Sequence, residues 1–432
     1  MQSIMSVSVA LFAGLMMTRL FKILKLGFPD VTAFLIAGLL VGPYGLGRIG
    51  LPGVGFQSSG SVEAVHVVID AALGFIAFSI GSEFKLEHLR RIGRKATVTA
   101  FLGAFGATIL IDIALIALHF IFGEKVVPLS VAITLGAVAA ATAPAATLMV
   151  VKQYKAKGAV TEMLLPIVAI DDAIGLVIFA VSFGIAQALV GGSLNVITVI
   201  AEPLIEIFCS FLLGASMGYI LSLLEKTFRS GRNRMAITIA LVLFTIAVSS
   251  VKIPLGTVTV SFSNLLVLMT MGMVFCNVSE FAEDIFYRSD RWSAPLFAAF
   301  FVLSGAELDL SVLAKANVVL IGVVYVLVRA VGKYLGAWLG CEMTGCEPEV
   351  KKYLGITLFP QAGVALGMTV TAATLGDTEG VMIRNIVLFG VLIYELIGPA
   401  LTKRALIASG DIQAKTSEHG TKRFDKTGKQ IS

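Results

Sequence analysis

Long apolar runs separated by short polar segments cover most of this 432-residue chain. The runs are about 17 to 25 residues long, the length an α-helix needs to cross a hydrocarbon core of roughly 30 Å. Helices satisfy their backbone hydrogen bonds within one segment, so the runs predict an all-α integral membrane protein embedded in the lipid bilayer. We expect thirteen transmembrane helices, at residues 3–21, 29–43, 64–82, 96–122, 128–151, 161–190, 196–224, 235–252, 262–279, 292–310, 316–340, 352–375 and 381–407.

The positive charges lie in alternate loops, and their distribution predicts the orientation. With the N-terminus outside, the inner segments contain most of the Lys and Arg residues, including those of 85–95, 152–157 and 226–234. Cytoplasmic loops of membrane proteins carry such an excess. We therefore predict a multi-pass protein of the cell (plasma) inner membrane, with its C-terminus in the cytoplasm. Residues 409–432 are polar without apolar periodicity, which predicts a short disordered cytoplasmic tail.

The composition argues against several other classes of protein. Charged residues make up 14% of the chain, whereas a soluble domain has roughly 25%. The net charge of +5 comes from the inner loops and does not form a nucleic-acid-binding patch. Four cysteines are too few and too scattered for a disulfide framework. The sequence contains no nucleophile–base pair, metal-ligand cluster or phosphate loop, so we expect neither an enzyme nor a cofactor.

Two short motifs recur at nearly the same offset along the chain. IGSEFKLEHL at 80–89 matches SGAELDLSVL at 304–313, and IDDAIG at 170–175 matches IYELIG at 393–398. The halves are seven expected spans apart, so the second half crosses the membrane in the opposite direction. Inverted repeats are typical of secondary transporters, which bind their substrate near the bilayer midplane between discontinuous helices.

Two adjacent carboxylates, Asp171 and Asp172, lie in the middle of the expected span 161–190. An ionisable group at this depth costs on the order of 2.5–3.5 kcal/mol. Two neighbouring carboxylates without water repel each other when both are ionised. At least one of them can therefore bind or release a proton near physiological pH. Their oxygens are also ligands for hard cations. The pair predicts an ion- and proton-binding site, and a structural salt bridge or a misplaced helix end is the alternative.

Lys333 is a buried cation in the expected span 316–340. It needs a counter-charge, and the aspartates form the only acidic pair at mid-membrane depth in the sequence. We predict that Lys333 pairs with Asp171 while Asp172 binds the ion. Lys333 is also a candidate second proton carrier, because a buried lysine can lose its proton when its partner changes. Arg329, one turn earlier, is either an anchor toward the outer half of the membrane or a functional residue.

Prolines interrupt two expected spans at matching positions of the repeat. Pro144 lies within LGAVAAATAPAATLMVV, where Thr142 and Thr147 supply hydroxyl groups, and Pro360 and Gln361 interrupt LFPQAGVALG. A proline inside a helix removes a backbone hydrogen bond and clashes with the preceding turn. The pattern predicts two unwound segments whose carbonyl groups face a cavity. A simple kinked packing helix is the alternative in each case.

Other acidic residues leave two interpretations open. Glu395 occupies the repeat position of Asp172 and is either an additional proton or ion group or, slightly favoured, a hydrogen-bonded structural carboxylate. Asp112 allows the same two interpretations. Glu83 and Glu307 end their helices near opposite faces and are interpreted as gate or capping residues.

The segments AIDDAIG, ATAPAAT, GKYLGAWLG and YELIGP resemble the monovalent cation:proton antiporter superfamily, which has the sodium/proton exchanger fold. The resemblance covers residues 1–408. Electroneutral members usually carry Asn-Asp and Thr-Asp-Pro at two of these motifs. Here Asp171-Asp172 and Ala143 occupy those positions, so the chain resembles the electrogenic members, which exchange two protons for one sodium ion. Glutathione-gated potassium efflux relatives usually carry Gln-Asp and a C-terminal nucleotide-binding domain, and this chain shows neither.

The resemblance implies a homodimer that works by elevator-type alternating access. It also implies a moving core, a dimerisation domain and a linker helix within residues 1–408. The core comprises residues about 96–190 and 316–407, the dimerisation domain about 3–82 and 235–310, and the linker helix 196–224. The discontinuous helices are expected to cross beside Asp172, at Thr142, Ala143, Pro144, Pro360 and Gln361.

We therefore hypothesise a secondary active transporter that exchanges Na+ (or Li+) for H+ and contributes to pH homeostasis. Asp172 would bind the cation or a proton, and Asp171 would exchange its Lys333 bridge for protonation. A K+/H+ antiporter of the same fold is the alternative, because selectivity depends on cavity size and ligand number. A sodium-coupled organic anion symporter is less favoured, since such a carrier would use neutral polar groups at the crossing.

Overall fold

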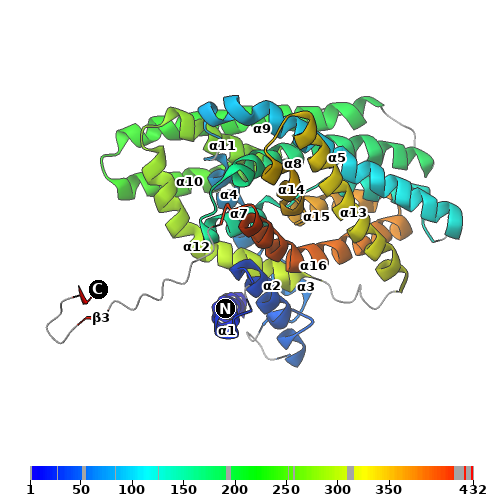
Figure 1. Ribbon diagram of the computed structural model, residues 1–432, viewed down its shortest axis with the longest axis horizontal. Helices are drawn as coiled ribbons and strands as arrows, with labels where there is room; N and C mark the ends of the chain where they lie inside the picture. The colour runs from blue at the N-terminus through cyan, green and yellow to red at the C-terminus, as the bar shows by residue number, and fades with distance from the viewer. Residues whose placement is uncertain are drawn as a thin grey trace.

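The computed structural model consists mainly of long helices and describes most of the chain. The described residues are 2–26, 28–50, 55–82, 84–124, 126–190, 196–251, 253–255, 258–308, 316–412, 423–424 and 430–431. In Figure 1 the short helices α7, α14 and α15 lie near the centre, with α1 and α2 at one edge and α9 at the opposite edge. Two antiparallel pairs, β1–β2 and β3–β4, are the strands of the described residues. The elements are α1 (Gln2–Ile23), α2 (Asp30–Val41), η1 (Leu46–Ile49), α3 (Ser59–Glu63), α4 (His66–Gly81), α5 (Leu86–Phe122), α6 (Leu129–Val138), α7 (Pro144–Tyr154), α8 (Ala159–Leu189), α9 (Val196–Thr227), α10 (Gly231–Ser249), β1 (Ile253–Leu255), β2 (Val258–Val260), α11 (Asn264–Val278), α12 (Ala282–Glu307), α13 (Ala316–Met343), α14 (Pro348–Thr357), α15 (Gly363–Ala372), η3 (Ala373–Leu375), α16 (Asp377–Ala408), β3 (Arg423–Phe424) and β4 (Gln430–Ile431).

Eight helices of the described residues are long and apolar enough to cross a membrane. Four shorter apolar helices accompany them, and each of the thirteen expected spans overlaps one helix or a set of two or three consecutive helices. The all-helical membrane fold is therefore confirmed, whereas thirteen crossings remain a prediction. The eight spans are Ser3–Ile23, Asp30–Ile49, Gly93–Phe122, Ala159–Leu189, Leu204–Thr227, Gly231–Ser249, Val318–Met343 and Thr378–Ala408.

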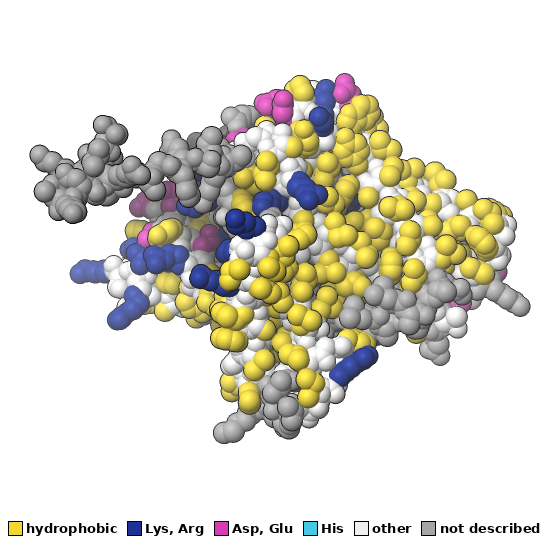
Figure 2. Space-filling view, turned by 60° about the horizontal axis from the view of Figure 1, so that its bottom comes forward, with side chains coloured by type: hydrophobic (Ala, Val, Ile, Leu, Met, Phe, Trp, Pro, Cys, Tyr) yellow, Lys and Arg dark blue, Asp and Glu magenta, His cyan; other side chains and the backbone are white. Residues whose placement is uncertain are grey.

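The surface carries large apolar side chains that a water-soluble protein would bury. Phe120 is 80% exposed and Val67 is 77% exposed, and many Leu, Ile and Phe side chains on α1, α5, α9 and α13 are also exposed. Figure 2 shows apolar side chains over a broad face, with several Lys and Arg side chains gathered at its left and centre. Contiguous apolar surface of this extent indicates contact with lipid.

Two helices begin about ten residues earlier than expected from the sequence. α5 starts at Leu86, where the expected span began at 96, and α12 starts at Ala282, where it began at 292. The apolar pattern ends where charged residues begin, but backbone hydrogen bonding continues through them because it does not depend on side-chain polarity. Both extensions lie at the helix ends that we expect to face the cytoplasm.

A row of glycines brings α13 against α5 without intervening side chains. A Cβ atom on Gly336 would lie 2.1 Å from the carbonyl oxygen of Leu102, and one on Gly332 would lie 2.7 Å from the Cα of Ala107. Gly340 meets Thr99 in the same way. Small residues at every fourth position allow two membrane helices to pack backbone against backbone. This contact fixes the position of α13, which carries both Arg329 and Lys333.

Buried apolar side chains form three clusters that follow two bodies of helices. One cluster is formed mainly by α2, α4, α11 and α12. The other two join α5, α8, α13 and α16 with the short helices α6, α7, α14 and α15. Ala145 and Leu148 of α7 belong to the first cluster, so the two bodies meet at this helix. Leu165 and Ala169 of α8 also belong to the first cluster, and the division into a moving core and a dimerisation domain remains a prediction.

The chain just after α16 packs against the start of α8. The Asp411 carboxylate accepts hydrogen bonds from the backbone N–H and the hydroxyl of Thr161, both at 2.7 Å. The N-cap of α8 is Gly158, which has no side chain to cap the helix. Asp411 therefore supplies the negative group that the helix N-terminus favours. Asp411 and Ile412 are buried, so the expected disordered tail begins at least four residues too early, and residues 413–422, 425–429 and 432 lie outside the described residues.

We expect Asp411→Ala to lower the free energy of unfolding by about 1–2 kcal/mol, because α8 loses its cap. Thermal unfolding of the purified protein in detergent measures the change. Asp284→Ala is the control, since Asp284 is half exposed and pairs within its own helix with Arg288. An unchanged melting temperature for Asp411→Ala would show that the residue does not stabilise the start of α8.

Candidate functional site

Two of the expected spans are interrupted near the centre of the bundle (Figure 1). The first is divided into α6, which ends at Val138, and α7, which begins at Pro144. The second is divided into α14, which ends at Thr357, and α15, which begins at Gly363. Pro144 is the first residue of α7, where its missing N–H costs no helical hydrogen bond. The break therefore precedes the proline, and the simple kinked helix considered from the sequence is wrong at this position.

The two interruptions contact each other directly. The backbone N–H of Ala143 donates to the carbonyl oxygen of Pro360 at 2.8 Å. The side-chain amide of Gln361 donates to the carbonyl oxygen of Val138 at 2.9 Å. These bonds hold the two interrupted segments against each other. The five expected crossing residues therefore lie close together: Thr142, Ala143, Pro144, Pro360 and Gln361.

Arg329 holds carbonyl groups from both interruptions. Its Nε donates to Ala139 at 2.9 Å, its Nη2 to Ala141 at 2.6 Å and its Nη1 to Phe359 at 2.8 Å. The guanidinium group also lies 4.5 Å from the ring centroid of Tyr394. The C-terminal ends of α6 and α14 carry partial negative charge, which a fully buried cation neutralises. Arg329 is therefore buried within the helix bundle and contacts the broken helices, and its depth in the membrane remains a prediction.

Tyr325, Arg329 and Lys333 are four residues apart, and all three side chains are fully buried. Residues at this spacing share one face of a helix, so this face of α13 meets the broken helices. The Tyr325 hydroxyl hydrogen-bonds the Gln361 amide, with 2.9 Å between Tyr325 Oη and Gln361 Nε2. This face of α13 thus contacts Gln361 as well as the backbone carbonyl groups that Arg329 binds.

Asp171 is satisfied by two donors from other helices. Lys333 Nζ lies 2.6 Å from Asp171 Oδ2, and both side chains are buried. The hydroxyl of Thr142 donates to the same oxygen at 2.5 Å. The structure thus brings together one acid of α8, the lysine of α13 and the first interruption. A buried pair of this kind persists only when the remaining polar atoms also find partners.

Asp172 differs from its neighbour because both of its carboxylate oxygens are buried without a hydrogen-bond partner among the described residues. Its side chain is 2% exposed. An isolated ionised carboxylate is very unfavourable in an environment of low dielectric constant. The group therefore has to hold a proton or a cation whenever it is out of contact with water. Carboxylate and carbonyl oxygens are the ligands that hard monovalent and divalent cations prefer.

The remaining candidates lie outside this cluster or support it from a distance. Thr147 donates to the carbonyl oxygen of Ala143 at 3.3 Å and so stays within the first turn of α7. Glu395 is buried in α16, and no hydrogen bond or ion pair of the described residues joins it to Asp171, Asp172 or Lys333.

Asp112 lies against α6 and leaves one carboxylate oxygen unpaired among the described residues. A Cβ atom on Gly136 would clash with that oxygen, which shows how closely the carboxylate approaches the helix. Glu307 ends α12 with one carboxylate oxygen 3.8 Å from His66 Nε2. Glu83 lies outside the described residues.

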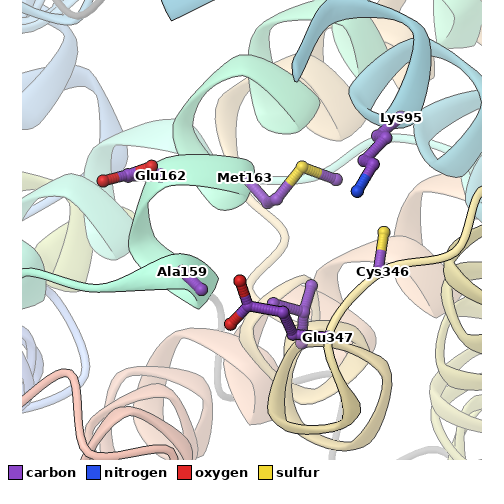
Figure 3. A pocket seen from close by; sticks show the side chains of 7 residues that line it. Lys95, Ala159, Glu162, Met163, Cys346 and Glu347 are labelled. Carbon is purple, nitrogen blue, oxygen red and sulfur yellow. The ribbon is translucent and has the colours of Figure 1, made fainter. Parts of the chain in front are cut away.

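A cavity of about 340 Å³ opens at the start of α8, away from the aspartate pair. Figure 3 shows Lys95 of α5 and Glu347 before α14 on different sides of it, with Met163 and Cys346 between them. None of the ion-pair or crossing residues lines it. Among the described residues, no cluster of three His, Cys, Asp or Glu side chains could hold a resident metal.

Discontinuous helices that meet beside buried ionisable groups define a secondary transporter of the membrane. The family model described as sodium/hydrogen exchanger, transmembrane, matches residues 7–407, and the chain belongs to this family. Cation:proton antiport is the function that this membership supports. A search of curated proteins gave no match.

Two solved structures share the fold. The sodium proton antiporter MjNhaP1 from Methanocaldococcus jannaschii at pH 8 is 20% identical, with a TM-score of 0.68 over 95% of this chain and 99% of that chain. An electron-microscopy study of the same antiporter gives 18% identity and a TM-score of 0.69 over 95% of this chain and 98% of that chain. At such identities the likeness shows the architecture alone.

Sequence reasoning missed several residues that build this site. Tyr325 could have been found from its spacing with Arg329 and Lys333, since three polar residues every fourth position share a face. The motif GKYLGAWLG was recognised in the sequence, but its glycines were not predicted to form the surface of α13 that packs on α5. Nothing in the sequence indicates which backbone carbonyl groups Arg329 would reach.

We expect Arg329→Met to lower the free energy of unfolding by about 3 kcal/mol or more, since three buried carbonyl groups lose their donor and each costs roughly 1–3 kcal/mol. Arg329→Lys should be intermediate, because an ammonium group keeps the charge but cannot match the planar fork. Thermal unfolding in detergent gives the order. Arg288→Met is the exposed control. Equal melting temperatures for Arg329→Met and the parent would show that the hydrogen bonds from Arg329 to the three carbonyl groups do not stabilise the fold.

Proposed function

We propose that this chain exchanges Na+ for H+ across the membrane, with Asp172 as the group that binds either ion. The observation that carries the proposal is a buried carboxylate that has no hydrogen-bond partner among the described residues and follows Asp171, which Thr142 of the first interruption contacts. A proton and a small cation are the two species that can neutralise this group without altering the surrounding protein. Binding of one excludes the other, which couples their movements.

The neighbouring pair supplies the second part of the proposed cycle. Asp171 holds Lys333 in the absence of another ion, and protonation of Asp171 would release the lysine. Lys333 could then lose its own proton, because an unpaired buried ammonium is unfavourable. The Thr142 hydroxyl also donates to Asp171, so the carboxyl group would keep one partner when the lysine leaves.

Elevator-type movement of one body of helices against the other is the proposed route of access. The site is formed by α8, α13 and the segments that precede α7 and α15. The buried apolar side chains of α8, α13 and α15 belong largely to the clusters of the proposed core. We further propose a homodimer in the plasma membrane, with a cytoplasmic C-terminus, from the distribution of positive charge and the family's architecture. A rigid core that carries the ion needs no channel through the protein.

Asp172→Asn should reduce cation-dependent proton flux at least roughly 100-fold, because an amide neither releases a proton nor neutralises a cation. The measurement is dye-reported proton flux in proteoliposomes on addition of Na+, Li+ or K+. Asp284→Asn makes the same chemical change at an exposed position and should retain the parent rate. Full flux in Asp172→Asn would exclude this residue as the shared site, and a response to K+ above Na+ and Li+ would favour a K+/H+ antiporter.

Acidification should raise the apparent KM for the cation, because protons and cations compete for one carboxylate. The rise should approach tenfold per pH unit once Asp172 is mostly protonated, whereas the maximal rate at saturating cation changes less. Initial rates over a series of cation concentrations and pH values, with the membrane potential clamped to zero, test this. A KM that stays constant while the maximal rate falls would indicate separate sites for the two ions.

A further inference from the structure

Lys152, near the end of α7, contacts α4 and α12, two helices of the other body. Its Nζ lies 2.6 Å from Asp290 Oδ1 on α12 and 2.5 Å from Ser79 Oγ on α4. The Ser79 hydroxyl donates to the same Asp290 oxygen at 2.9 Å, which closes a triangle of three side chains. The ammonium group also lies 5.9 Å from the ring centroid of Phe297.

The next residue adds a contact with a third helix of that body. The side-chain oxygen of Gln153 accepts a hydrogen bond from the backbone N–H of Asp30 at 2.9 Å. Asp30 is the first residue of α2, so Gln153 satisfies a donor that the helix itself leaves free. Two consecutive residues of α7 therefore tie the crossing helix to α2, α4 and α12.

An apolar layer lies between this triangle and the site. Ala145, Leu148 and Met149 of α7 face Ile76 of α4 and two phenylalanines of α12, Phe297 and Phe301. The gap between them has no room for a water molecule. A dry apolar gap carries neither ions nor protons. Lys152, two turns of α7 beyond the crossing, also lines this gap.

We propose that Lys152, Asp290 and Ser79 form a latch that keeps the cytoplasmic approach to the ion site closed. The proposal rests on the exchange function above, because only a transporter that alternates its access needs a closure that reopens. The side chains of Lys152 and Asp290 are 25% and 40% exposed. Ion pairs so close to water are weak enough to break and re-form in each cycle. The residues of the latch come from both bodies, so the ion pair must separate when the bodies move.

Thiol accessibility tests the latch without relying on transport. Ala145→Cys, in a chain whose four native cysteines are replaced by alanine, places one buried thiol at the apolar layer. A membrane-impermeant maleimide is added on the side of the C-terminal tail. We expect Asp290→Asn to raise the rate of labelling about fivefold over the parent, the factor expected from loss of one weak interaction. Lys152→Gln should act in the same direction.

The controls separate a latch from general loosening. Asp284→Asn removes the same charge from the same helix but breaks a pair within α12, and it should leave labelling at the parent rate. The exchange Lys152→Asp with Asp290→Lys restores the pair with reversed polarity and should return labelling toward the parent rate. Equal acceleration by Asp284→Asn would overturn the latch.

Labelling and flux together distinguish the two proposals. If Asp290→Asn leaves labelling unchanged while the parent shows Na+-dependent proton flux, the latch is wrong and the exchange function stands. If labelling rises as expected but the parent shows no cation-dependent proton flux, the triangle still closes this route and the proposed exchange is wrong.

Discussion

The absence of water at mid-membrane depth is the constraint on which the arrangement of this protein depends. Unwinding two helices frees backbone carbonyl groups that cannot be solvated by lipid. The protein satisfies them from within, through the guanidinium group of Arg329 and the amide of Gln361. Once these groups are occupied, few polar partners remain for a carboxylate placed beside them. Among the described residues, the Asp172 carboxylate lacks a hydrogen-bond donor, in keeping with the use of the nearby Arg329 and Gln361 donors by carbonyl groups.

Two chemically identical neighbours consequently have different surroundings. Asp171 receives both Lys333 and Thr142 on one oxygen, whereas Asp172 receives neither. Successive residues of a helix point about 100° apart, so one can face α13 while the other faces elsewhere. The pair therefore places a carboxylate bound to Lys333 next to one without a hydrogen-bond partner among the described residues, and the difference arises from helix geometry.

The features that the sequence could predict are those that conflict with lipid. Asp171, Asp172 and Lys333 stand out because charges interrupt apolar runs, and prolines marked both interrupted helices. Other features have no such contrast. The three acceptors of Arg329 are backbone groups, which every residue possesses. Asp411 caps α8 from 250 positions away along the chain, and its segment is as polar as a disordered tail. The polar start of α5 shows the same difficulty, since a helix outside the hydrocarbon has no apolar pattern to reveal it.

The glycine contact between α5 and α13 has a mechanical consequence. With no side chains at the seam, neither helix can slide or roll over the other without a clash of main-chain atoms. α5 has 37 residues and is therefore roughly 55 Å long, more than the thickness of the hydrocarbon core. Any rigid tilt of α5 would therefore displace α13 as well, and with it the buried Lys333.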